Sequence, residues 1–233
     1  MRKDVKNLLG SYEFWLMIAV LFITAPVTML LNREADMYGV GAIDRFYSSF
    51  IRMNFVLNYA FPLVPIFACS KLYFAENHKY RVLSVLLASM LVFLIPFSVI
   101  FVIEWVMEGK LGGVFPVSGV FFDLSGGYQS NFVLLFVLNT LLLSAAYALL
   151  GWAVAQKSES KVNYLLIPLM LYEVDLFTPF AFNNELLLGL INGSYNVAWG
   201  VEYPLAGQVI AILFPLIIAG GIFLSMRIKT KKE

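Results

Sequence analysis

Charged residues are scarce in this chain, and cysteine and histidine are nearly absent. Only 13% of its 233 residues are charged, whereas 61% are hydrophobic. A soluble chain of this length could not bury so much apolar surface in one core, which excludes soluble enzyme folds. The single cysteine, Cys69, cannot form a disulfide within the chain, and the single histidine, His78, cannot build a metal site of several histidines. The composition indicates an integral membrane protein.

Motifs of nucleotide and peptide hydrolysis are also missing. The GxxxxGK[ST] loop does not occur, because Gly109-Lys110 is followed by Leu111 and has no glycine five residues earlier. There is no HExxH motif, and an intramembrane serine protease would need a histidine at membrane depth. The formal net charge of +1 provides no basic field for nucleic acid. We therefore expect a chain that is not an enzyme and binds no cofactor or metal itself.

What the sequence does contain is long apolar runs. A helix needs about 20 apolar residues to cross the core of a bilayer, and six runs of that length occur. They lie at approximately residues 12–31, 54–73, 82–106, 131–155, 162–182 and 206–226. The runs are continuous in polarity, which favours helices over the alternating strands of an outer-membrane barrel. The predicted fold is one all-α membrane domain over residues 1–233, with six transmembrane helices.

The distribution of lysine and arginine predicts that both termini are cytoplasmic. With six spans, the termini and the loops after spans two and four share one side, and that side has 12 basic residues against four. Cytoplasmic loops carry such an excess. Within residues 1–11, Val5, Leu8 and Leu9 recur at helical spacing, continue to Tyr12, and lie opposite the charged residues. This pattern predicts a short amphipathic helix in the membrane interface.

Prolines and small residues distinguish the predicted helices from one another. Proline interrupts five of the six spans, where it removes a backbone donor and favours a kink. Kinked bundles occur among transporters, although proline is common in membrane helices generally. The fourth span instead carries Ser144, Ala148 and Gly151 at spacings that permit close packing. Asn139 and Thr140, near its middle, either bond across helices or face a substrate.

Two acidic residues, Glu173 and Asp175, lie within the fifth span. Glu173 is about 17 Å along a helix that starts near Val162, close to the bilayer midplane, where an ionised carboxylate is costly. Glu173 must therefore be protonated, be paired or hydrated inside the bundle, or lie at a break in the helix. Residues two apart point about 200° away from each other, so the pair cannot face one narrow cavity on an unbroken helix. We interpret the fifth span as one that breaks, ends early near Pro179, and is followed by short re-entrant outer helices.

The segment between spans two and three is aromatic and mixed in charge. It reads Lys71-Leu-Tyr-Phe-Ala-Glu-Asn-His-Lys-Tyr-Arg81 and is predicted to be a short cytoplasmic helix. Such an element can dock in a groove of a soluble partner, and the alternative is a plain polar turn. The candidate docking residues are Leu72, Tyr73, Phe74, Glu76, Asn77, His78 and Lys79.

Taken together, these features resemble the membrane subunit of an ABC-2 type ABC exporter, the stand-alone six-span permease of bacterial drug, bacteriocin and peptide export or immunity. The resemblance rests on the interfacial helix at residues 2–12, the acidic segment at residues 72–81, the long connection between spans five and six, and the basic tail. In that family the acidic residue of the loop is usually followed by glycine and then threonine or serine. Here Glu76 is followed by Asn77 and His78.

The resemblance implies a mechanism that supplies the missing nucleotide site. Two membrane subunits, identical or related, would pair through spans one and five in the bacterial plasma membrane. Two separate ATPase subunits would bind ATP and Mg. The movement of their closure would be transmitted to the substrate path through the interfacial helix and the loop around Glu76. The substrate would be an amphipathic or lipophilic peptide, bacteriocin, toxin or drug. Candidate residues of the path are Asn139, Thr140, Glu173 and Asp175, and the alternative for Glu173 and Asp175 is a structural role at the outer mouth.

Two other functional classes remain open. An ion-coupled carrier or channel would use Glu173 or Asp175 as a proton or cation site. Carriers of this kind often contain an internal repeat, and residues 1–106 and 131–233 show none. A membrane anchor or sensor would move no substrate. Neutralising Glu173 should abolish ion coupling in a carrier and leave much of the transport of an ATP-driven exporter.

Overall fold

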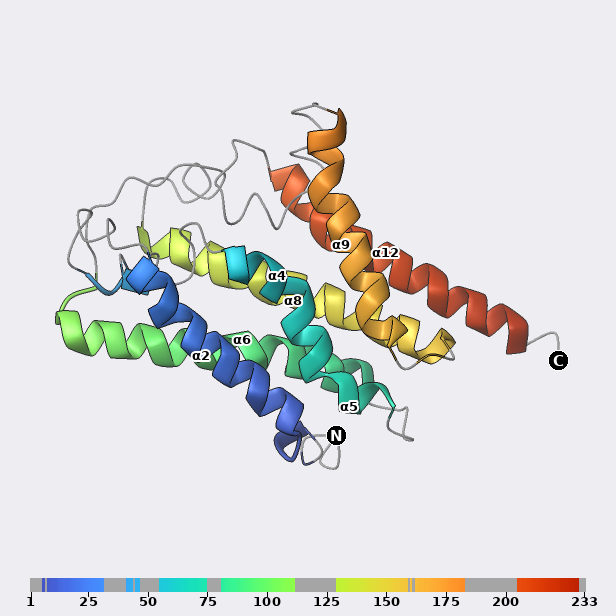
Figure 1. Ribbon diagram of the computed structural model, residues 1–233, viewed down its shortest axis with the longest axis horizontal. Helices are drawn as coiled ribbons and strands as arrows, with labels where there is room; N and C mark the ends of the chain where they lie inside the picture. Colours follow the sequence, from blue (N-terminus) through green and yellow to red (C-terminus); the bar gives the residue numbers. More distant parts are fainter. Residues whose placement is uncertain are drawn as a thin grey trace.

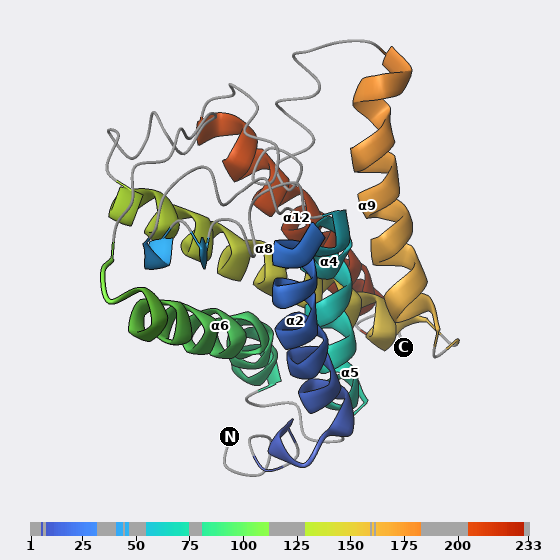
Figure 2. The same cartoon turned by 60° about the vertical axis from the view of Figure 1, so that its left-hand side comes forward.

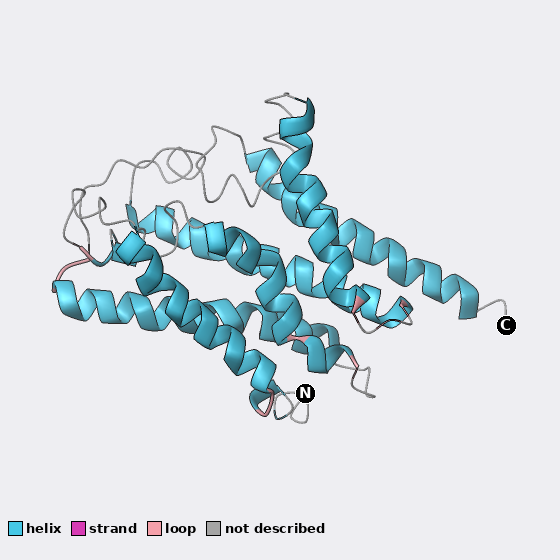
Figure 3. Cartoon of the chain, in the orientation of Figure 1, coloured by secondary structure: helices cyan, strands magenta, loops and turns pink. Residues whose placement is uncertain are grey.

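All regular elements in the described part of the chain are helices. The structure is a computed structural model, and it describes residues 6, 8–31, 41–43, 45–46, 55–74, 81–111, 129–158, 160, 162–182 and 205–230. Within these residues no strand occurs (Figure 3). The predicted all-α fold is confirmed for this part of the chain.

The long helices occupy the positions of the six predicted spans. They are α2 (Tyr12–Leu31), α4 (Phe55–Ala68), α6 (Arg81–Glu108), α8 (Gln129–Lys157), α9 (Asn163–Phe182) and α12 (Leu205–Thr230), with the short helix α5 (Ser70–Tyr73) after α4. By length and hydropathy, two helical stretches of the described residues could cross a membrane, Arg81–Glu108 and Val137–Lys157. The apolar stretches Tyr12–Thr24 and Ile212–Met226 are shorter. The hydropathy pattern therefore located the helices.

The last turn of the predicted interfacial helix is described. Lys6, Leu8 and Leu9 are helical, and the amide of Gly10 donates to the carbonyl of Lys6 at 2.9 Å. Leu8 is buried against the bundle, whereas Leu9 is exposed. This turn therefore has one face on the bundle and one away from it. The remainder of that predicted helix lies outside the described residues.

α8 is the central helix of the bundle. The helices α4, α6, α9 and α12 all pack against it, while α2 packs against α4 and α6 (Figures 1 and 2). Its buried face carries Ser144, Ala148 and Gly151, and Ser144 Oγ donates to the carbonyl of Ser89 on α6 at 3.0 Å. A Cβ atom on Gly151 would lie 3.0 Å from the hydroxyl of Tyr73, so this close approach depends on glycine. The structure agrees with the prediction of a packing helix.

α6 is largely apolar on its exposed face as well as on its buried face, where Ser84, Ser89 and Glu104 are the polar exceptions beyond Arg81. Val85, Ala88 and Val92 are fully buried, whereas Leu87 is 40% exposed and Val106 is 76% exposed. A helix that is apolar all round is surrounded either by protein or by lipid. Water-soluble monomers rarely expose so long an apolar face, and this face therefore favours a membrane environment.

The fifth span corrects one prediction from the sequence. α9 is one continuous helix from Asn163 to Phe182, so it does not break at Glu173 and Asp175, although its bounds agree with the predicted span at residues 162–182. Helical hydrogen bonds join backbone groups, and glutamate is a good helix former. The cost of a carboxylate in an apolar environment therefore does not by itself break the helix. The predicted re-entrant helices that would follow α9 lie outside the described residues.

Candidate functional site

The candidate docking segment begins at a bend between α4 and α5. α4 ends at Ala68, and Cys69 follows with φ −89° and ψ −2°, whereas the ψ of an α-helix is about −42°. The amides of Leu72 and Tyr73 both donate to the Cys69 carbonyl, at 2.9 and 3.3 Å, and close the single turn of α5. The buried Cys69 thiol lies 3.6 Å from the carbonyl of Val85 on α6. The second predicted span is thus two helices joined at Cys69.

Tyr73 connects α5 to α8 and α9. Its side chain is fully buried, and its hydroxyl donates to the carbonyl of Ala148 at 2.8 Å. Its own carbonyl accepts a hydrogen bond from Nε2 of Gln156 at 2.7 Å. Its ring packs edge-on against Tyr164 of α9, with the ring centroids 5.6 Å apart. A polar group buried in an apolar surrounding is costly to leave unbonded, so these hydrogen bonds fix α5 on the bundle.

Lys71 connects α5 to the start of α2. Its ammonium group lies 3.2 Å from Oε2 of Glu13 and 5.1 Å from the centre of the Tyr12 ring. The same carboxylate oxygen accepts a hydrogen bond from the hydroxyl of Ser11 at 2.6 Å. The Lys71 side chain is 43% exposed and that of Glu13 is 12% exposed. Because the lysine is partly exposed, the pair contributes about 1 kcal/mol or less.

The structure divides the candidate docking residues into buried anchors and an exposed tip. Leu72 and Tyr73 are buried, so they hold α5 on the bundle and offer no surface to a partner. Phe74 is 48% exposed, and its ring meets that of Tyr164 edge-on at 5.7 Å between centroids. The remaining candidates, which lie outside the described residues, are Glu76, Asn77, His78 and Lys79.

Several partners of α5 were not among the sequence candidates. The α5 cluster, as we define it, comprises Ser11, Glu13, Lys71, Tyr73, Ala148, Gln156 and Tyr164. Its members come from four helices and the residue before α2, and no local sequence pattern connects them. Glu13 carried the one usable signal, because it is an acidic residue in the first turn of an apolar run, where an unpaired charge is costly.

The candidate path residues on α8 and α9 are partly buried. Asn139 and Thr140 are buried in α8, and Nδ2 of Asn139 has no hydrogen-bond partner among the described residues. Glu173 is half-buried on α9. The backbone of Asp175 belongs to α9, and its side chain lies outside what the structure describes. Polar groups at these positions therefore lie inside the bundle or at its edge.

These path residues do not gather at one point. The rings of Tyr147 on α8 and Tyr172 on α9 lie edge-on with centroids 6.0 Å apart, which places Glu173 at the level of Tyr147. Asn139 is eight residues earlier on α8, about 12 Å along the helix axis. α9 also diverges from α8 towards its C-terminal end (Figures 1 and 2). A path that uses both Asn139 and Glu173 must run along the bundle.

Comparisons of the chain with protein-family models, with curated proteins and with solved structures find no match.

Proposed function

We propose that this chain is the transmembrane subunit of an ATP-driven exporter of the ABC-2 type. It moves an amphipathic or lipophilic substrate out of a bacterial cell. In this proposal all six long helices cross the plasma membrane and both termini are cytoplasmic. Two such subunits, identical or related, form the path, and ATP and Mg bind to two separate ATPase subunits.

The α5 cluster is the observation that carries the proposal. A subunit without its own nucleotide site needs an element that receives movement from a partner and passes it to several helices. α5 contacts α2 through Lys71, α8 through Tyr73, and α9 through the ring of Tyr164. It leads directly into residues 75–80, which hold Glu76 and its charged neighbours in the sequence. This is the connection that a docking loop requires.

The arrangement of helix ends supports a cytoplasmic position for α5. The start of α2, the end of α8 and the start of α9 all meet at α5, and Val85 near the start of α6 contacts Cys69. Lys157 Nζ lies 3.2 Å from Ser225 Oγ near the end of α12. We call this the α5 end of the bundle. Helices that alternate in direction have this arrangement, and the α5 end corresponds to the side with 12 basic residues.

The contacts of α5 also set a scale for the movement that they can transmit. A neutral hydrogen bond contributes about 1 kcal/mol, and a partly exposed ion pair contributes about as much or less. The contacts of the α5 cluster together therefore contribute a few kcal/mol. A movement of residues 75–80 that costs less free energy than this leaves α5 attached to α2, α8 and α9. ATPase closure that displaces residues 75–80 would move these helices together and bias the bundle between two arrangements.

The proposal is tested by reconstituting the chain in lipid nanodiscs with the product of the adjoining gene, which the proposal expects to be an ATP-binding cassette protein. Phe74→Ala and Glu76→Gln should weaken co-purification and lower ATP hydrolysis, about tenfold or more where the side chain is a central contact. Val106→Ala is the matched control, because it removes an exposed apolar side chain at the opposite end of the bundle. Unchanged association and hydrolysis in both test variants would remove the docking proposal.

A second candidate is an ion-coupled carrier, and the position of Glu173 favours it. This carboxylate is half-buried on a continuous helix, ten residues after the first residue of α9. Ionisable residues at such depth often mark ion pathways. Glu173→Gln distinguishes the candidates in proteoliposomes, because it should abolish ion-driven flux in a carrier and leave ATP-driven flux largely intact in an exporter.

A further inference from the structure

A cavity lies between α6, α8 and the segment at residues 45–46, away from the α5 cluster. Its volume is about 420 Å³. Apolar side chains form nearly all of its lining, chiefly Phe46, Leu94, Phe97, Phe101, Leu134 and Val137. Ligand pockets commonly measure about 300–1,000 Å³, and an apolar cavity of about 150 Å³ is enough to bind benzene. The space is therefore large enough for the hydrocarbon part of a small molecule.

Aromatic contacts hold the walls of this cavity in place. Phe46 is 1% exposed, and its ring meets those of Phe97 and Phe101 edge-on, with centroids 5.5 and 5.8 Å apart. Phe93 and Phe97 lie 5.8 Å apart in turn. Such ring pairs contribute beyond the area that they bury. Packed aromatic rings therefore form one wall of the cavity, which is open on the side of the exposed Leu94, Val102 and Leu134.

The backbone also fixes the segment that carries Phe46. α6 ends at Glu108, and Gly109 follows with a φ of +67°, a conformation that glycine adopts at no steric cost. The chain then turns so that the amide of Ala42 donates to the carbonyl of Lys110 at 3.1 Å, and that of Ile43 to Leu111 at 3.0 Å. Residues 45–46 are thus held along the last turns of α6.

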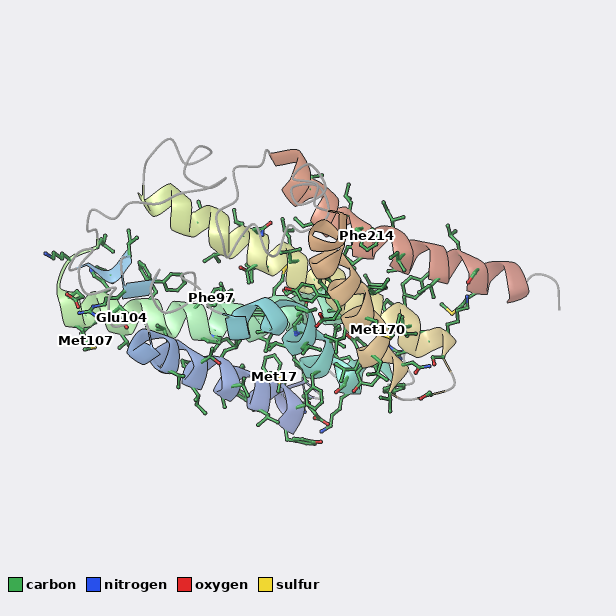
Figure 4. The ribbon with its side chains drawn as sticks, turned by 45° about the horizontal axis from the view of Figure 1, so that its top comes forward. Met17, Phe97, Glu104, Met107, Met170 and Phe214 are labelled. Atoms are coloured by element: carbon green, nitrogen blue, oxygen red, sulfur yellow. The ribbon has the colours of Figure 1, made fainter. Side chains whose placement is uncertain are left out.

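A charged group lies next to the cavity on the same face of α6. Phe97, Phe101, Glu104 and Glu108 are spaced by four, three and four residues, which places them within about 60° on the helix. Figure 4 shows Phe97 and Glu104 in this order towards the end of α6. Glu104 is 8% exposed, and Arg45 Nε lies 3.1 Å from Glu108 Oε1. The aromatic lining therefore leads to charged side chains about one helical turn beyond Phe101.

The balance of charge in this group favours a cation. Among the described residues of this group, two carboxylates, Glu104 and Glu108, share one guanidinium, that of Arg45, which is bonded to Glu108 and also acts on Glu104. Lys110 is exposed to the surroundings. A carboxylate buried in an apolar setting is stabilised by a second positive partner. Glu104 is thus suited to receive the charged end of a ligand whose apolar part occupies the cavity.

We propose that this cavity is a binding site for an amphipathic cation, a molecule with a hydrocarbon body and a primary ammonium head. The hydrocarbon body lies between Phe46, Phe97 and Phe101, and the ammonium group pairs with Glu104. The molecule enters sideways from the lipid, past Leu94 and Val102, which are 38% and 51% exposed. A lipophilic amine and a lipid with an ammonium headgroup share this chemistry.

The test uses the full chain alone in phosphatidylcholine nanodiscs, with dodecylamine and dodecanol as probes of equal chain length. Binding is measured by isothermal titration calorimetry. The heat of partition into lipid is measured with empty nanodiscs and subtracted. Dodecylamine should bind about tenfold more tightly than dodecanol, because a charge-assisted hydrogen bond to a buried carboxylate is worth about that factor. Competition by phosphatidylethanolamine in the nanodisc would identify a lipid as the natural occupant, and lack of competition would identify a free amine.

Two variants separate the roles of charge and shape. Glu104→Gln should weaken dodecylamine about tenfold and leave dodecanol unchanged. Val102→Trp, which adds bulk at the cavity wall, should weaken both probes about tenfold, because the exclusion of two methylene groups already has that effect. Val106→Trp is the matched control, one turn further on the exposed face of α6, and should bind both probes as the unmodified chain does.

The site itself is located by a dodecylamine that carries a diazirine on its chain. Cross-links should map by mass spectrometry to residues 94–102 and 134–137. Equal affinity for amine and alcohol, or unchanged binding in both Glu104→Gln and Val102→Trp, would overturn the proposal and leave only a space filled by lipid tails. No ATPase takes part in these measurements, so this site and the exporter proposal can fail independently.

Discussion

Gly151→Ala is expected to destabilise the chain, and Tyr73→Phe should remove much of that effect. A Cβ at position 151 would lie 3.0 Å from the Tyr73 hydroxyl and 3.1 Å from Cγ2 of Ile66. Overpacking of this kind costs about 1–3 kcal/mol, and the better helix propensity of alanine returns about 1 kcal/mol. The net loss in the free energy of unfolding should therefore be up to about 2 kcal/mol.

Tyr73→Phe alone removes the hydrogen bond to Ala148 and should cost about 1 kcal/mol, or somewhat less in a membrane setting. In the double variant the nearest atom to the new methyl group is gone, and only the contact with Ile66 remains. The two changes should then cost about 1 kcal/mol less together than the sum of the single variants. The sign of this coupling follows from the 3.0 Å approach.

Equilibrium unfolding in mixed micelles, followed by circular dichroism, measures all three variants. Gly220→Ala is the control, because a Cβ there would meet nothing within 4 Å, so alanine should be neutral or slightly stabilising. Additive losses within about 0.5 kcal/mol would show that Tyr73 does not lie against Gly151 and would refute the packing of α5 on α8.

Three further predictions concern the α5 end and the orientation of the chain. A double-mutant cycle of Glu13→Gln and Lys71→Met should give a coupling free energy of about 0.2–1 kcal/mol, measured from thermal midpoints. This coupling should decrease between 50 and 500 mM NaCl, because salt screens a partly solvated ion pair. A coupling that does not depend on salt would contradict such a pair. Cys69 should react with maleimide only after denaturation in detergent, because its side chain is fully buried, and rapid labelling of the folded chain would contradict the bend between α4 and α5. A membrane-impermeant maleimide applied to intact cells should label Lys110→Cys and not Lys157→Cys, both of which replace exposed residues; the reverse pattern would invert the proposed topology.

The positions of the helices could be predicted because hydropathy is a local property. Each span needs its own run of about 20 apolar residues, whatever its neighbours are. The first predicted span and α2 accordingly share the same bounds, Tyr12–Leu31. The bend at Cys69 has no such local signal, because neither proline nor glycine occurs at residues 66–73. It depends on Tyr73 and its partner on α8, which is remote in the sequence.

The ion pairs of the structure could not be predicted for the same reason. Arg45 and Glu108 are 63 residues apart, and Glu13 and Lys71 belong to different spans. A single sequence gives the cost of a charge in an apolar run, and it does not say which partner removes that cost. The interpretation of Glu173 was wrong in a related way, because it considered the side chain and disregarded the backbone hydrogen bonds that keep α9 continuous.

The central position of α8 has a consequence for biosynthesis. Chains are made from the N-terminus, so α2, α4 and α6 leave the ribosome before α8 does. Until then the hydroxyl of Tyr73 lacks the carbonyl of Ala148, and the carbonyl of Ser89 lacks the hydroxyl of Ser144. The first three long helices therefore stay incompletely assembled until the fourth arrives. α9 and α12, made last, find their packing surface already present.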